Sequence, residues 1–467
     1  MVMTSRTRTL GARPDWTPQF DASGSKPRYL AFVEALARDI DSGALKPGTR
    51  LLPQRGMAAQ LGLSLGTISR AYAEAEARGL ISGEVGRGTF VQRRTADASG
   101  KAPVMVNLAL NVPPPTGEED VIAGAVGDIL ADGGLKPLLD YLPHQGLATH
   151  RVMVGEWLAG QRIVCDVNNL LITNGGQHAL SIAAGLIAQP GQPVLTERFT
   201  YSGMTALAAQ SRYVLHGVDG DEHGLLPDQL DRAFRETGAR ALFATPTLQT
   251  PIGTVMPAER RQAIAAIVRR HDAYLIEDDV YAFLLETPPQ PIAMAIPERT
   301  FYVTSFAKCL APGLRIGAMV VPDSFRDRGI NGVRATGWMA SPLMAEVLAR
   351  LIRSGNLARQ VQLKRREAEL RNAIADRALG SFLPRMSNVP GFHRWLPLPQ
   401  GRTLDALVAQ AAQAGITLAA PGTLQQVDRG TLGVRICLGH SARGDDLERA
   451  LVALRRILET AETMSFV

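Results

Sequence analysis

Residues 305–317 read SFAKCLAPGLRIG and place Ser305, Lys308 and Arg315 between a short apolar run and the start of the next one. A lysine amine in such a position has two possible roles. It is either a solvated surface charge or a nucleophile that attacks carbonyl compounds from a partly desolvated pocket. For a lysine considered alone, the surface role is the more common one. The nucleophilic role therefore requires other groups of the chain to meet at the same place.

Short apolar segments alternate with longer segments of helical length from about residue 107 onward. The apolar segments read NLLITN, PVLTE, RALFAT, AYLIEDD, FYVTSF and AMVVP. This alternation is typical of an α/β domain in which helices cover both faces of a mainly parallel sheet. Helical patterns dominate from about residue 341, and a compact region that ends in TLGVRICLGH predicts a smaller α/β lobe. Because such sheets bind ligands at the carboxyl ends of their strands, the residues after each strand are the candidates.

Several predicted strands are followed by a group that could bind one common ligand. GGQHAL is a glycine turn that opens a helix, whose free amides suit a phosphate. Tyr201 follows PVLTE, Asp278 and Asp279 end AYLIEDD, and Lys308 follows FYVTSF. Pyridoxal phosphate needs such a set: a lysine for its aldehyde, a carboxylate for its pyridine nitrogen, an aromatic ring for its face, and an arginine, a hydroxyl and amides for its phosphate. Singly, the aspartates could cap a turn and the tyrosine could lie in the core, but together these groups favour the cofactor.

The first fifth of the chain carries the whole excess of positive charge. Residues 1–95 hold 14 Lys or Arg and 8 Asp or Glu, a net charge of +6, and the remaining residues are neutral overall. This asymmetry indicates a basic module for a polyanion such as DNA, with a basic tail kept for solubility as the alternative.

The pattern of this basic region predicts helix, helix, turn, helix and a hairpin. YLAFVEALARDIDSG and QRGMAAQLG are helical, LSLGTISRAYAEAEARGL is a helix capped by Ser64, and ISGEVGRGTFV gives two short strands. This order is typical of a winged helix-turn-helix, in which the helix after Ser64 enters the major groove. The side chains expected to contact bases or phosphates are Arg55, Thr67, Ser69, Arg70 and Arg87.

Residues 25–92 resemble the DNA-binding domain of the GntR family of bacterial repressors. The resemblance rests on the entry ALKPGTRLLPQRG and on the wing GRGTFV. One departure is Leu65, which stands where recognition helices of that family often carry a basic residue. The resemblance implies binding to DNA operator half-sites.

Residues from about 107 to 460 resemble fold-type I aminotransferases, and their combination with a GntR-like head resembles the MocR group of regulators. The resemblance implies that Lys308 forms a Schiff base with pyridoxal phosphate and that Asp279 meets the pyridine nitrogen. It also implies that Tyr201 stacks on the ring and that Tyr281 lies near the ring hydroxyl. Ser305, Arg315, Gly176 and Gln177 would hold the phosphate. Arg435 of GVRICLGH would bind a substrate carboxylate, and Tyr141 and Gly146 of DYLPHQGLATHR would border the pocket of a homodimer.

Three positions depart from the aminotransferase pattern. Thr250 replaces the asparagine that meets the ring hydroxyl, and Phe199 stands where proline is common. Ala282 occupies the position three residues after Asp279, where a tyrosine is usual. Cofactor binding is expected in spite of these changes, whereas transamination is expected to be weak or vestigial if it occurs.

The composition indicates a globular cytoplasmic protein without a membrane span. Only three cysteines occur, and the eight histidines show no metal-ligand spacing and are interpreted as solvated or hydrogen-bonded. We expect a disordered segment over residues 1–24, a winged helix-turn-helix over 25–92, a linker over 93–106 and an aminotransferase-like domain over 107–463, with its small lobe at about 345–463.

Three functions remain open: a transcription regulator that senses an amino acid or amine, a working aminotransferase with a DNA-binding head, and a regulator whose effector is pyridoxal phosphate itself.

Overall fold

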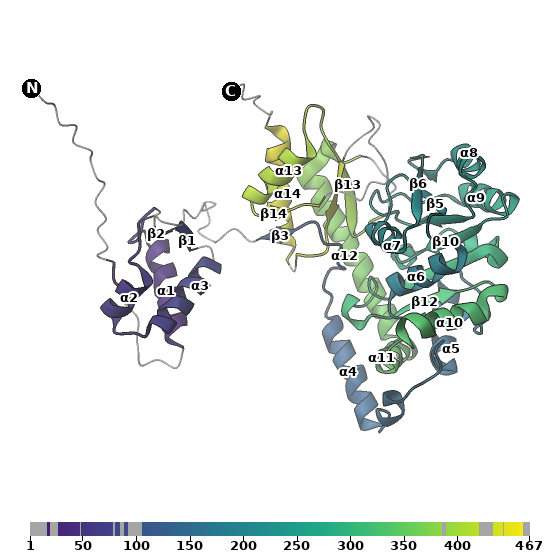
Figure 1. The fold of residues 1–467 in the computed structure, drawn as a ribbon, viewed down its shortest axis with the longest axis horizontal. Helices are drawn as coiled ribbons and strands as arrows, with labels where there is room; N and C mark the ends of the chain where they lie inside the picture. The colour runs from purple at the N-terminus through teal and green to yellow at the C-terminus, as the bar shows by residue number, and fades with distance from the viewer. Residues whose placement is uncertain are drawn as a thin grey trace, which may run out of the picture. The chain divides into compact units, whose positions relative to one another are not determined.

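The computed structural model covers the 467-residue chain and describes residues 16–18, 27–46, 48–77, 80–84, 88–91, 105–384, 389–419, 433–441 and 443–460. The chain divides into two compact units, Met1–Val104 and Met105–Val467 (Figure 1). Nearly all of the predicted disordered segment, most of the predicted linker and Arg87 lie outside the described residues.

The described residues of the smaller unit form three helices and a two-stranded antiparallel sheet. Ser64 caps the third helix, because its Oγ accepts a hydrogen bond from the main-chain N of Thr67 at 3.1 Å. Phe32, Ile68 and other apolar side chains of all three helices form one buried core. The predicted order of elements is confirmed: α1 (Arg28–Asp41), α2 (Gln54–Leu61), α3 (Leu65–Ala77), β1 (Ile81–Glu84) and β2 (Gly88–Val91).

The larger unit is built on a seven-stranded sheet of order β4-β12-β11-β10-β9-β5-β6. Neighbouring strands are parallel except β12, which is antiparallel to both of its neighbours. All six predicted strands form, and β6 is an additional strand whose half-exposed edge position gives it no long apolar run. The strands are β4 (Leu170–Thr173), β5 (Pro193–Glu197), β6 (Val214–Val218), β9 (Ala241–Ala244), β10 (Tyr274–Asp278), β11 (Thr300–Ser305) and β12 (Gly317–Val320).

Helices cover both faces of this sheet, as the alternation predicted (Figure 1). Side chains of α6, α7 and α10 pack with Phe301 and Val303 on one face, while α5 and α11 pack with Tyr302 on the other, because successive strand residues point to opposite faces. The other face also carries α8 and α9. The helices of this part are α4 (Glu118–Ala131), α5 (Ala148–Gly160), α6 (Gly176–Ile187), α7 (Ser202–Ser211), α8 (Pro227–Thr237), α9 (Ala258–Arg270), α10 (Arg326–Gly337) and α11 (Pro342–Arg353).

The small lobe has its own core, which packs between two short sheets and the helices α12 (Asn356–Leu379), α13 (Leu404–Gln413) and α14 (Gly444–Glu459). β13 (His393–Pro397) and β15 (Gly433–Cys437) pair antiparallel. β14 (Ile416–Thr417) pairs parallel with β3 (Val106–Asn107), so the lobe also includes the last residue of the predicted linker and the residue after it.

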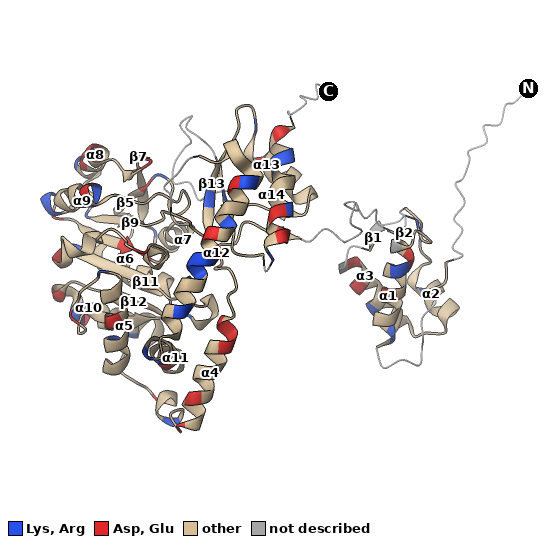
Figure 2. Ribbon diagram, turned by 180° about the vertical axis from the view of Figure 1, so that it is seen from behind, with Lys and Arg blue, Asp and Glu red and all other residues tan. Residues whose placement is uncertain are grey.

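Short elements complete the larger unit. A hairpin joins β7 (Gly220–Asp221) and β8 (Gly224–Leu225), and single turns of 3-10 helix occur at η1 (Lys136–Leu139), η2 (Ala282–Leu284), η3 (Ile292–Met294), η4 (Pro297–Arg299), η5 (Pro312–Leu314), η6 (Asp323–Phe325) and η7 (Gly380–Phe382). Lys/Arg and Asp/Glu both occur along the helices of this unit, as its neutral net charge requires (Figure 2). No helix among the described residues is long and apolar enough to cross a membrane.

Candidate functional site

Lys308 lies three residues beyond the last residue of β11, at the carboxyl end of that strand. Burial lowers the pKa of its amine to about 8, with the Cys437 thiol opposing that shift and the positive charge of Arg435 adding to it. The Nζ donates a hydrogen bond to the main-chain oxygen of Asn111. An amine with such a pKa is neutral in about one molecule in ten at pH 7, far more often than a solvated lysine. Lys308 therefore has the environment of a nucleophile.

Asp278 and Asp279 point in different directions. Burial raises the pKa of Asp278 to about 7, and the nearby charge of Lys308 acts in the opposite sense. The Asp279 carboxylate instead accepts a hydrogen bond from the hydroxyl of Tyr302 at 3.1 Å, and burial raises its pKa while Arg261 lowers it. The charge of Lys308 thus acts on Asp278, whereas the Asp279 carboxylate is engaged by Tyr302, although the family resemblance had assigned the cofactor nitrogen to Asp279.

Two residues that were not selected from the sequence join this cluster. The Nδ2 of Asn111 donates to the hydroxyl of Tyr281 at 2.7 Å and lies 3.3 Å from Nδ1 of His393. The Nε2 of His393 donates to the main-chain oxygen of Gln249 at 3.2 Å, which leaves Nδ1 as the acceptor. Burial lowers the pKa of His393 to about 3, so its ring is neutral. No local spacing in the sequence signals either residue, because Asn111 and Tyr281 are 170 positions apart.

The start of α6 forms a compact polar corner. Gly175 precedes this helix with φ 80°, and a Cβ placed on it would lie 2.7 Å from Nη2 of Arg315. A Cβ on Gly176 would lie 3.3 Å from Cβ of Ser305. Arg315 itself has φ 54° and ends η5 in the left-handed conformation, which is uncommon for residues other than glycine. Free helix amides, a guanidinium and a hydroxyl thus meet where a phosphate could bind.

Gln177 and Tyr201 approach each other beside this corner. The Gln177 Nε2 donates to the main-chain oxygen of Gly203 at 2.8 Å, whereas its buried Oε1 has no hydrogen-bond partner within the described part of the chain. A Cβ on Gly203 would collide with both the Tyr201 ring and Gln177. Burial raises the pKa of the Tyr201 hydroxyl, and the negative charge of Asp278 adds to this effect. Both predicted residues therefore belong to the cluster.

Arg435 extends from β15 of the small lobe toward the same place. Its Nη2 donates to the main-chain oxygen of Ala109 at 3.0 Å, and the Sγ of Cys437 approaches the same oxygen at 3.4 Å. The positive charge of Arg435 lowers the pKa values of Lys308 and His393. The predicted carboxylate-binding arginine is therefore held by a backbone carbonyl of the segment after β3.

Three predicted residues make no hydrogen bond with Lys308 within the described part of the chain. Thr250 is buried in the turn after β9, and no hydrogen bond among the described residues joins it to Lys308, Asp278 or Tyr281. Tyr141 is 78% exposed and packs on Trp338 with ring centroids 5.6 Å apart. A Cβ on Gly146 would lie 2.7 Å from Ile172.

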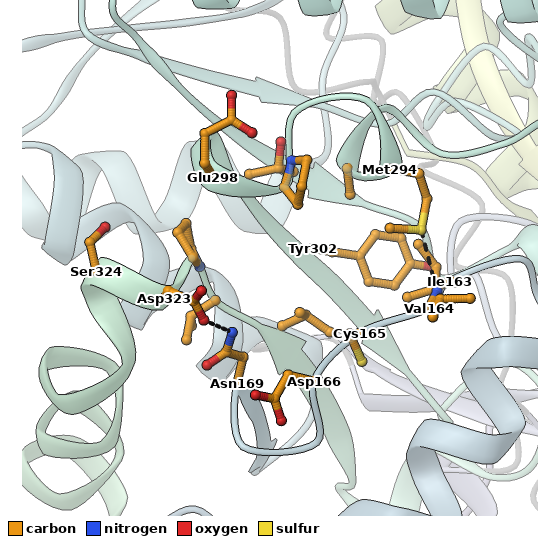
Figure 3. A pocket seen from close by; sticks show the side chains of 16 residues that line it. Ile163, Val164, Cys165, Asp166, Asn169, Met294, Glu298, Tyr302, Asp323 and Ser324 are labelled. Atoms are coloured by element: carbon orange, nitrogen blue, oxygen red, sulfur yellow. Dashed lines mark hydrogen bonds between the residues drawn. The ribbon is translucent and has the colours of Figure 1, made fainter.

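A cavity of about 450 Å³ lies at the opposite edge of the sheet (Figure 3). Asn169 and Thr300, at the amino ends of β4 and β11, line it together with Cys165, Met294 and Asp323. None of the predicted site residues that the structure describes lines this cavity, so the chemistry described above belongs to the carboxyl edge.

In the smaller unit, the predicted DNA contacts are partly engaged within the protein. The hydroxyls of Thr67 and Ser64 lie 2.8 Å apart, and Ser69 Oγ donates to Gln54 Oε1 at 2.7 Å. The guanidinium of Arg70 lies 4.3 Å from the ring centre of Tyr29. Arg55 is exposed at the start of α2.

Residues 103–451 match the family described as aminotransferase class I and II. The chain belongs to this family. Residues 28–91 of this aminotransferase-family chain also match the bacterial regulatory proteins of the gntR family. The two resemblances predicted from the sequence are thereby confirmed.

Curated relatives align with this chain along most of their length. The chain is 28% identical to the HTH-type transcriptional regulator YdeF of Bacillus subtilis, over 95% of this chain and 97% of that protein. It is 28% identical to the probable rhizopine catabolism regulatory protein MocR of Rhizobium meliloti, over 74% and 76%. It is 26% identical to the pyridoxine biosynthesis transcriptional regulator PdxR of Corynebacterium glutamicum, over 83% and 86%.

Solved aminotransferases share the fold of the larger unit. The kynurenine aminotransferase of Pyrococcus horikoshii superposes with a TM-score of 0.69 at 23% identity, over 76% of this chain and 90% of that chain. The alpha-aminoadipate aminotransferase LysN of Thermus thermophilus gives a TM-score of 0.68 at 22% identity, over 76% and 92%. These similarities establish a fold-type I aminotransferase fold.

Proposed function

We propose that this protein is a DNA-binding transcription regulator that depends on pyridoxal phosphate and senses an amino acid or amine. The observation that carries the proposal is the presence, in one chain, of a gntR-type winged helix and of a lysine, carboxylate and arginine cluster at the carboxyl edge of an aminotransferase sheet. The regulator names of the relatives support it. We further propose that it acts in the cytoplasm as a homodimer on two operator half-sites.

The residues of the site fit pyridoxal phosphate. Among the described residues, Asp278 Oδ1 and Gln177 Oε1 are buried without a hydrogen-bond partner, and glycines 175 and 176 let Arg315 and Ser305 approach the start of α6 closely. Buried polar atoms of this kind are normally satisfied, so they indicate a polar ligand at this place. The residues that would hold the cofactor are Lys308, Asp278, Tyr281, Tyr201, Gly176, Gln177, Ser305 and Arg315.

Bound pyridoxal phosphate supplies an aldehyde that condenses with amines and a ring that accepts electrons. The amine of Lys308, neutral in part at pH 7, provides the nucleophile. Within the described part of the chain, the buried Oδ1 of Asp278 has no hydrogen-bond partner, so a protonated ring nitrogen would favour the ionised carboxylate. Arg315, Ser305 and the first amides of α6 would neutralise the phosphate.

The choice of Asp278 makes a specific prediction. Asp278→Asn is expected to weaken pyridoxal phosphate binding by about 10- to 100-fold, because an amide cannot supply the charge-assisted hydrogen bond. Asp279→Asn is the matched control, since its carboxylate binds Tyr302, and it should change thermal stability more than cofactor affinity. Binding is measured by titration of the cofactor-free protein with absorbance detection. If Asp279→Asn lost more affinity for pyridoxal phosphate than Asp278→Asn, Asp279 would be the carboxylate that meets the ring nitrogen.

The reactivity of Lys308 should depend on pH with an apparent pKa of about 8. Only the neutral amine attacks an aldehyde, so the rate should rise about tenfold per pH unit below that value and level off above it. Cofactor-free protein is labelled with a small aldehyde and cyanoborohydride over a pH series that brackets this value, and each lysine peptide is quantified by mass spectrometry. The exposed Lys136 serves as internal control. Parallel pH profiles for the two lysines would contradict a desolvated Lys308.

The segment after β3 could transmit the state of this pocket. Arg435 binds the oxygen of Ala109, and Lys308 binds the oxygen of Asn111, so both ligand-binding cations hold carbonyl groups of the same short backbone segment. A ligand carboxylate that takes the Nη2 donor of Arg435 would displace the oxygen of Ala109. The chain continues from this segment through residues 92–106 into the DNA-binding region. A ligand that binds more tightly when Ala109 is displaced from Arg435 than when Ala109 is held there can therefore shift DNA binding.

A second function, a working aminotransferase, is favoured by one observation. With Asp278 at the ring nitrogen, Tyr281 stands three residues later, which is the spacing expected from the aminotransferase pattern. The deciding experiment records the visible spectrum of the holoprotein with a panel of amino acids and no keto acid, and DNA affinity in parallel. Conversion of the cofactor to its pyridoxamine form favours the enzyme, whereas a changed DNA affinity without conversion favours the sensor.

A further inference from the structure

The exposed start of the recognition helix α3 is apolar. Leu65, its first residue, is 45% exposed, and its neighbours Ser64 and Gly66 are exposed as well. A single exposed leucine is ordinary on protein surfaces. The position of Leu65 is less ordinary, because the first turn of this helix is the part of a helix-turn-helix that meets base edges.

The polar side chains of α3 that could read bases make contacts with other residues of the smaller unit. The Thr67 hydroxyl pairs with Ser64, the Ser69 hydroxyl donates to Gln54, and the Arg70 guanidinium stacks on Tyr29. If these groups contacted bases directly, they would have to give up the contacts that they already make within the protein. Leu65 is the exposed large apolar side chain of the first turn, whereas Ile68 is buried.

The surroundings of Leu65 suit a polyanion. A hollow of about 520 Å³ is lined by Leu65, by the exposed Arg50 and Arg55 and by Gly88 and Thr89 of β2. Among the residues that the structure describes, no acidic side chain lines it. The two arginines line the same hollow as the leucine and supply positive charge for phosphates, so DNA is the occupant that the charge favours.

Gly66 has no structural reason to be glycine. Its φ lies outside the left-handed region, and the nearest described atom to a Cβ placed on it would be the Ser64 Oγ at 4.0 Å. Glycine disfavours a helix relative to alanine. The missing side chain therefore leaves open space beside Leu65 and the free amides of the helix start, which a closely approaching partner can use.

We infer that Leu65 reads the C5-methyl group of a thymine in the major groove, with Gly66 allowing the close approach. Apolar contact with that methyl is the way in which an aliphatic side chain distinguishes a T·A pair. The inference rests on the proposed DNA-binding function and adds the chemistry of one recognised base. It assigns specificity to a position where the GntR-like pattern often has a basic residue.

The test starts from the operator that the full-length protein selects from random duplexes. Each thymine of a half-site is then replaced by uracil, which keeps every hydrogen-bonding group and lacks only the methyl. Affinity is measured by fluorescence anisotropy at fixed salt. The wild-type protein should lose about fourfold in affinity per half-site at one thymine, the effect of one buried methyl. Leu65→Ala should bind the thymine and uracil duplexes equally.

Controls separate this inference from its premise. Leu130→Ala removes a similarly exposed leucine from α4 of the larger unit and should keep the roughly fourfold discrimination. Gly66→Ala should raise the thermal midpoint of the smaller unit and still weaken operator binding. If wild-type protein binds no duplex, the proposed function itself fails. If it selects an operator but Leu65→Ala retains the discrimination, or no thymine is sensitive, the inference is overturned and the function stands.

Discussion

Lys308→Ala is expected to abolish the pyridoxal phosphate that borohydride traps covalently on the protein. The reason is that the amine of Lys308 lies at the carboxyl end of β11 with its pKa lowered to about 8 by burial, near the buried Asp278 carboxylate. The measurement is reduction of the holoprotein followed by mass spectrometry of its peptides. The expected loss is complete, because the alanine side chain carries no amine to react.

Two controls accompany this variant. Lys308→Arg keeps the positive charge and should also trap no cofactor, which separates chemistry from electrostatics. Lys136→Ala removes an exposed lysine of η1 and should trap as much as the wild type. Undiminished trapping in Lys308→Ala would identify another lysine as the reacting group, and peptide mapping would locate it.

A fragment that begins at Met105 is expected to lose DNA binding while it keeps the cofactor. Residues 1–95 carry all of the net charge of +6, and the remaining residues are neutral overall. DNA affinity of the full chain should fall about a hundredfold between roughly 50 and 200 mM salt if about four phosphates are contacted, because each contact releases a condensed counterion. Anisotropy titrations of both proteins over a salt series measure this effect.

Cofactor absorbance provides the folding control for the fragment. Met105–Val467 forms a compact unit of its own and contains each residue assigned to the cofactor. A fragment that retains cofactor absorbance and loses DNA binding would support the proposal that the smaller unit binds DNA and the larger unit binds the cofactor. Equal affinity in fragment and full chain would instead place the DNA-binding surface in the aminotransferase-like unit.

The segment that holds Ala109 and Asn111 also bears on the class of effector. Arg435 is held by the oxygen of Ala109, a neutral acceptor that a carboxylate can outcompete through a charge-assisted bond. A simple amine has no group for Arg435 and would act only at Lys308. An amino acid can act at Lys308 and also bind Arg435, so we favour amino acids over amines as effectors.

The two-part organisation and most of the fold could be predicted from the sequence. Apolar runs separated by helical lengths predict a mainly parallel sheet because strands buried on both faces must be apolar throughout. The helix order and the located charge predict the winged helix. Ser305, Lys308 and Arg315 could be selected because they follow one strand, and Gly176 because it follows a glycine turn.

The choice between Asp278 and Asp279 required the folded chain. Adjacent residues at a strand end point to opposite faces, and the sequence does not state which face carries Lys308. The recruitment of Asn111 and His393 likewise depends on folding, since they are 282 positions apart and meet only when the small lobe packs on the segment after β3. The same holds for Ser69, whose hydroxyl finds its Gln54 partner only once α2 and α3 are packed together. Local patterns fix which elements form, whereas side-chain partners depend on the faces that those elements turn toward one another.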